Sequence, residues 1–123
     1  MAPKALSELR KFIWMVRMTI EYVVVGSQSE MRDRRAKRVA VGDHDVALWY
    51  IGGTFYAIGN VCAHQHFPMM HQGTVEGLTV RCPMHGWRYS LETGMAVEGS
   101  GKLPVFDVRV DGESVAVSKE PRS

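Results

Sequence analysis

The sequence predicts a mostly β protein made of antiparallel sheets, with one helix at the N-terminus. Short runs rich in Val, Ile and Tyr recur along the chain, and Gly, Asp or Asn residues separate them. The length of 123 residues is enough for one core and too short for two. We therefore expect a helical extension over residues 1–18 and a single domain over residues 19–120.

Residues 4–18 have the periodicity of an amphipathic helix. Its apolar positions are Leu6, Leu9, Phe12, Ile13 and Val16. We expect this helix to pack on its own domain; a docking element for a partner and a dispensable extension are the alternatives. Arg17 interrupts the apolar run, which is too short for a membrane span or a secretory signal. The sequence therefore predicts a cytoplasmic protein.

From Ile20 onward the pattern is that of strands. They are predicted over residues 20–25, 39–41, 46–51, 55–58, 79–81, 105–110 and 114–117. Asp111-Gly112 is a strong hairpin turn between the last two. The basic run at residues 32–38 is expected to be a solvated loop and strand edge, and a docking patch for an acidic redox partner is the alternative.

Composition and cysteine content narrow the possible functions. A formal charge of +2 does not indicate a nucleic-acid-binding protein. Cys62 and Cys82, the two cysteines, could form one disulfide or contribute to one metal site. Each is followed closely by a histidine, in Cys62-Ala63-His64 and in Cys82-Pro83-Met84-His85. A disulfide does not use these histidines, so a metal site is the better interpretation.

The two half-motifs resemble those of the Rieske family, C-x-H followed by C-x-x-H. The segment CPMHGW is similar to the second cluster loop of Rieske ferredoxins, and the resemblance runs from about residue 19 to about residue 118. It implies a Rieske fold with a two-loop cluster-binding subdomain and one [2Fe–2S] cluster per chain. By this resemblance Cys62 and Cys82 hold one iron, and His64 and His85 hold the other.

The same resemblance implies an electron carrier rather than an enzyme. The expected partners are a flavin reductase as donor and the terminal oxygenase of a multicomponent oxygenase as acceptor, with no nucleic acid and no membrane. Two alternatives stay open. One is a small Rieske-like subunit of an assimilatory nitrite reductase, and the other is a non-redox module with zinc on the two Cys and two His ligands.

Departures from the respiratory members of the family predict a low-potential centre. Those members have an additional cysteine in each loop, and this chain has none, so we expect packing to support the loops. The predicted supports are Pro68, Met69, Met70, Pro83 and Trp87. Trp87 replaces a serine that donates to cluster sulfur, whereas Tyr89 is kept and would raise the potential modestly if its hydroxyl reached Cys62 or Cys82 sulfur. His66 and His71 are expected to be solvent-exposed, with a place at the cluster mouth as the alternative.

Overall fold

The computed structural model describes residues 21–62, 68–83 and 86–122. Within these ranges the strands form three antiparallel sheets, as the sequence predicted. The helix predicted over residues 4–18 lies outside the described residues. None of the helices in the described ranges has the length and apolarity needed to cross a bilayer.

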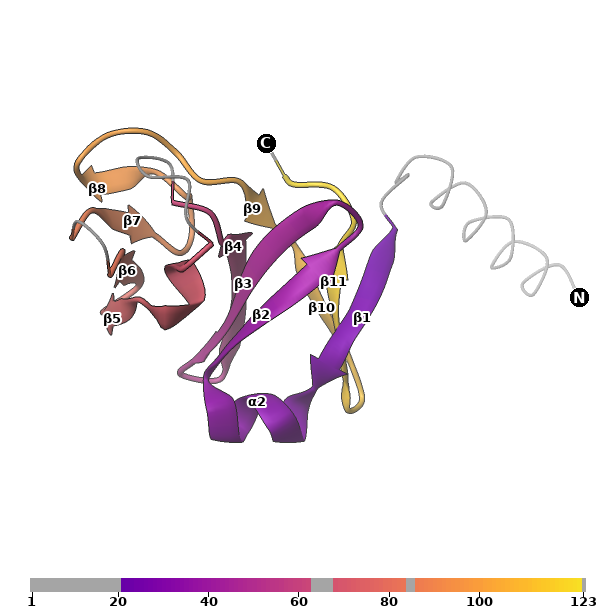
Figure 1. The fold of residues 1–123 in the computed structure, drawn as a ribbon. Coiled ribbons are helices and arrows are strands. Elements are labelled where there is room, and N and C mark those ends of the chain that lie inside the picture. Colours follow the sequence, from indigo (N-terminus) through magenta and orange to yellow (C-terminus); the bar gives the residue numbers. More distant parts are fainter. Residues whose placement is uncertain (1–20, 63–67, 84–85, 123) are drawn as a thin grey trace, which may run out of the picture.

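The central sheet separates the other two sheets (Figure 1). Its order is β2-β3-β4-β9, and its strands are β2 (Ala36–Val41), β3 (His44–Ile51), β4 (Thr54–Gly59) and β9 (Val105–Phe106). The outer sheet has the order β1-β11-β10, with β1 (Tyr22–Ser27), β11 (Ser114–Ser118) and β10 (Val108–Asp111). The small sheet consists, in order, of β5 (Thr74–Glu76), β6 (Thr79–Arg81), β7 (Arg88–Ser90) and β8 (Ala96–Glu98).

Both faces of the central sheet are buried. Successive side chains of a strand point to opposite faces, and β3 has buried residues at four consecutive positions. Ala47 and Trp49 belong to the core that the central sheet shares with the small sheet. Val46 and Leu48 belong to a second core, shared with the outer sheet. The central sheet thus supports the small sheet and the loops that emerge from it.

A short helix occupies the region where the sequence predicted a basic loop. Helix α2 (Gln28–Arg34) starts after Ser27, whose Oγ accepts a hydrogen bond from the Glu30 amide at 3.2 Å. Met31 is fully buried and anchors the helix in the second core, while Arg32 is exposed. Met31 is the one apolar residue of this helix, and a single residue gives no periodic hydrophobic pattern, so the sequence did not predict the helix.

The strand predicted over residues 105–110 is two strands in different sheets. The chain passes from the central to the outer sheet at Asp107. The Asp107 amide donates to Ser118 Oγ at 3.0 Å, and the Ser118 amide donates to the Asp107 carbonyl at 2.8 Å. These two bonds fix the crossing point. The strands β5, β7 and β8 were not predicted, because three residues are too few to show an alternating apolar and polar pattern.

Candidate metal centre

The first loop, defined here as residues 61–68, leaves the end of β4 and returns to the central sheet. Val61 and Pro68 form an antiparallel bridge that closes its base. The 3-10 helix η1 (Met70–Gln72) follows the loop and packs on β2 and β3. Cys62, just inside the loop, is fully buried. The first loop is therefore fixed to the central sheet at both ends.

The second loop, defined here as residues 82–87, connects β6 with β7. The Cys82 amide donates to the Trp87 carbonyl at 2.7 Å, and the Gly86 amide donates to the Cys82 carbonyl at 3.0 Å. Gly86 has a φ of 71°, a left-handed conformation that glycine adopts without strain. These bonds close a tight loop directly beyond the last β6–β7 pair, Arg81 and Arg88.

The two predicted sulfur ligands lie in one core. Cys62 and Cys82 are both buried in the core between the central and small sheets, and neither forms a disulfide. Gly73 keeps the two halves close, because a Cβ there would lie 2.6 Å from the Arg81 carbonyl oxygen and 2.7 Å from Val80 Cγ2. The fold thus brings one thiol from each loop into the same apolar interior.

This donor set fits an iron–sulfur centre. Two buried thiols on separate loops can supply two thiolates to one iron, and thiolates are ligands for iron–sulfur clusters as well as for zinc. His64 and His85 lie outside the described residues, so their role as ligands stays a prediction. Accordingly, the described ranges contain no group of three or more side chains able to hold a metal.

Packing supports the loops in part as expected. Met70 is fully buried in the same core as the cysteines, which confirms its predicted role, whereas Pro83 is exposed, so that prediction was wrong. Trp87 is half-buried, and its indole ring fills the space where a side chain at residue 99 would lie, so only glycine fits there. Tyr89 is fully buried beside the cysteines in this core.

A charged network on the small sheet binds the second loop. Arg81 donates from Nε to Glu76 at 2.7 Å, and from Nη1 to Glu98 at 2.8 Å and to the Gly86 carbonyl at 2.6 Å. Its hydrogen bond to Glu98, followed by that to Glu76, raises the pKa of Arg81. The hydrogen bond from Arg81 lowers the pKa of Glu98. Both groups are therefore charged at neutral pH, and Arg81 anchors the loop by a charge-assisted bond.

Asn60 is the site residue that the sequence interpretation missed. Asn residues were interpreted as separators between strands, but Asn60 is fully buried, and its side chain binds Pro68 at the end of the first loop and His71 beyond it. His71 was expected to be solvent-exposed and is instead half-buried, with Nδ1 3.0 Å from Asn60 Oδ1. Burial lowers the pKa of His71. His66, like His64, lies outside the described residues.

Comparison with known proteins agrees with this arrangement. The profile of the Rieske [2Fe–2S] domain matches residues 21–107. The ferredoxin component of the alkene monooxygenase system of Xanthobacter autotrophicus is 30% identical over 103 residues, which cover 83% of this chain and 84% of the relative.

Two solved structures share the fold. One is a chain from the complex of reduced oxygenase and oxidized ferredoxin in carbazole 1,9a-dioxygenase, with a TM-score of 0.76, 30% identity and coverage of 83% of this chain and 96% of that one. The other, a nitrite reductase small subunit from Mycobacterium tuberculosis, has a TM-score of 0.75 at 21% identity, with coverage of 80% and 95%. At that identity the second likeness concerns the fold alone.

Taken with the two buried cysteines on paired loops, these matches define an iron–sulfur electron-transfer domain. The chain belongs to the Rieske [2Fe–2S] family. As a Rieske ferredoxin it carries electrons on its cluster and is not itself a catalytic enzyme.

Proposed function

We propose that this protein accepts one electron from a flavin reductase and passes it to a terminal oxygenase. The observation that carries the proposal is the burial of Cys62 and Cys82 in one core, on two loops whose bases are closed by backbone hydrogen bonds or a β-bridge. Relatives named as ferredoxin components or subunits of oxygenase systems support the choice of acceptor.

The proposed ligands are Cys62, His64, Cys82 and His85. A Rieske cluster held by these groups supplies a one-electron couple whose potential is higher than that of an all-cysteine cluster, because two neutral imidazoles replace two thiolates. Cys62 and Cys82 would bind from the apolar core, where they are shielded from water. Trp87 and Tyr89 would line the protein side of the site, one on the second loop and one on β7.

The domain limits and the location of the protein are part of the proposal. We place the Rieske domain at residues 19–120 and a helical extension at residues 1–18, which agrees with strands that run from β1 to β11. A cytoplasmic location is the second part of this proposal.

The test uses the purified full-length chain. We expect visible absorbance, about two iron and two sulfide per chain as a [2Fe–2S] cluster requires, and reversible bleaching by a flavin reductase with NADH. The bleached protein should recover its colour when a Rieske terminal oxygenase is added. A colourless protein with stoichiometric zinc would contradict the proposal, and so would a coloured protein that the reductase cannot reduce.

A further inference from the structure

Asn60 joins the two ends of the first loop through its side chain. Its amide group is fully buried, and Nδ2 donates to the Pro68 carbonyl at 3.0 Å and to Asp45 Oδ1 at 3.0 Å. Its Oδ1 accepts from the His71 amide at 2.7 Å and lies 3.0 Å from His71 Nδ1. The side chain therefore uses both of its donor positions and both of its acceptor positions.

The backbone of Asn60 adds two bonds to the same region. Its amide donates to the Asp45 carbonyl at 2.8 Å, and its carbonyl accepts from the Met70 amide at 3.0 Å. Asn60 stands two residues before Cys62; its partner Pro68 ends the loop, and its partners Met70 and His71 follow it. One residue thus connects the start of the first loop, its end and strand β3.

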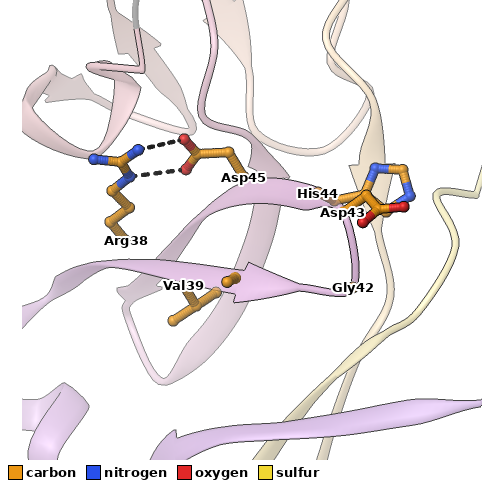
Figure 2. A pocket seen from close by; sticks show the side chains of 7 residues that line it. Arg38, Val39, Gly42, Asp43, His44 and Asp45 are labelled. Carbon is orange, nitrogen blue, oxygen red and sulfur yellow. Dashed lines mark hydrogen bonds and ion pairs between the residues drawn. The ribbon is translucent and has the colours of Figure 1, made fainter.

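The direction of the Asn60 amide is fixed by charge. Arg38 binds the Asp45 carboxylate with two hydrogen bonds, at 3.0 and 2.7 Å, and Figure 2 shows the two groups facing each other. An ionised carboxylate only accepts hydrogen bonds, so Asp45 selects the Nδ2 end of Asn60. The Oδ1 end must then face His71, whose backbone amide can only donate. A flipped amide would place acceptor against acceptor and donor against donor.

We infer that Asn60 is a positioning residue for the first cluster loop, and that the Arg38–Asp45 ion pair sets the direction of its amide. The inference rests on the proposed function, since this loop carries the proposed ligands Cys62 and His64. Buried groups that orient a metal-binding loop influence both how long the metal is retained and its electronic properties.

The decisive test is an exchange of the two polar groups. Asn60→Asp places a carboxylate against Asp45 and removes the donor to Pro68. We expect cluster loss about tenfold faster than in the wild type, as for one unsatisfied buried group, together with altered EPR g values. The double variant Asn60→Asp with Asp45→Asn again sets a donor of residue 45 against an acceptor of residue 60, but the Pro68 carbonyl still lacks its donor and Arg38 Nε loses its acceptor. We expect it to recover part of the cluster lifetime that Asn60→Asp loses.

A matched control removes a buried polar group far from the loops. Ser118 is buried and its hydroxyl binds the Asp107 amide and the Glu120 carbonyl. Ser118→Ala should lower thermal stability but leave the g values and the potential unchanged. This control separates a loss of positioning from a general loss of stability.

The outcomes are distinguishable. A wild-type chain without a [2Fe–2S] spectrum would remove the proposed function. If the wild type shows this spectrum and Asn60→Asp matches it in cluster lifetime and g values, the inference is overturned and the proposed function stands. If Asn60→Asp fails to fold, the double variant decides: a coloured, folded protein, even with a shorter cluster lifetime than the wild type, supports the inference, and no coloured protein overturns it.

Discussion

Arg81 Nη1 donates a hydrogen bond to the carbonyl oxygen of Gly86 at 2.6 Å, and so ties the last residue of β6 to the second loop. Glu76 and Glu98 hold the same guanidinium in place. The second loop thus has a charged anchor on the small sheet, as the first loop has Asn60 on the central sheet. Each half of the proposed cluster site is positioned by a polar side chain outside the ligand motif.

Arg81→Gln should weaken this anchor. A neutral amide of shorter reach cannot bind both glutamates and the Gly86 carbonyl, so we expect the cluster to be lost about two- to fivefold faster, as for a partly exposed ion-pair network. Loss of visible absorbance over time measures the effect. Arg122→Gln is the control, because Arg122 binds Asp107 with two hydrogen bonds far from the loops. Equal decay in both variants would show that Arg81 does not position the loop.

Tyr89→Phe should lower the reduction potential. The Tyr89 hydroxyl is buried in the core that holds both cysteines. If it donates to cysteine sulfur, one net hydrogen bond of about 1 kcal/mol corresponds to about 40 mV for a one-electron couple. Protein-film voltammetry measures the shift. Tyr56→Phe removes a hydroxyl from a half-buried residue packed on the same core and should leave the potential unchanged. An unchanged potential in Tyr89→Phe would exclude the bond.

Gly73→Ala should destabilise the joint between the two loops. The new Cβ would meet the Arg81 carbonyl oxygen at 2.6 Å, and backbone atoms of a paired strand cannot move aside alone. We expect a loss of about 1–3 kcal/mol, or about 5–15 °C in Tm. Gly26→Ala is the matched control, because its Cβ would meet only the ends of the flexible Glu30 and Lys37 side chains. A calorimetric scan with equal Tm values for both variants would contradict this packing.

His71 should make stability depend on pH. Burial, and next the charge of Arg38, lower the pKa of His71 from 6.5, so the unfolded chain binds more protons between the lowered value and 6.5. The free energy of unfolding therefore rises with pH through this window and falls as the pH drops below about 6.5. In His71→Asn the side-chain amide can still donate to Asn60 and does not titrate. Urea unfolding at several pH values should show a weaker pH dependence in this variant, whereas parallel curves would rule out His71 as the source.

The sequence predicted the sheets more reliably than their junctions. Alternating β-branched residues bounded by Gly, Asp and Asn marked the strands that became β3, β4 and β11. The break at Asp107 was not predictable, because it depends on a bond to Ser118 in a strand eleven residues further on. Helix α2 was missed because tertiary burial of Met31, rather than a periodic pattern, stabilises it.

The ligand motif was visible in the sequence and its supports were not. Cys62 and Cys82 stand in short, recognisable motifs, and the structure buries both in one core. Asn60 gave no such signal, because its partner Asp45 is fifteen residues away and Pro68 is eight away. From the sequence alone, Arg81 could equally have been an ordinary basic residue exposed at the edge of a sheet. Long-range polar contacts of this kind depend on the folded register and cannot be derived from local spacing.

The position of strand β3 between the two cores affects how the domain unfolds. Val46 and Leu48 help to seal one core, and Ala47 and Trp49 help to seal the other. Opening either core to water would displace β3, which also forms part of the other core. Partial unfolding is therefore suppressed, and the β3 amides should exchange their hydrogens only through global unfolding. The bleaching of the visible chromophore in denaturant should then coincide with the melting of the remote outer sheet, and colour alone would report on the integrity of the whole domain.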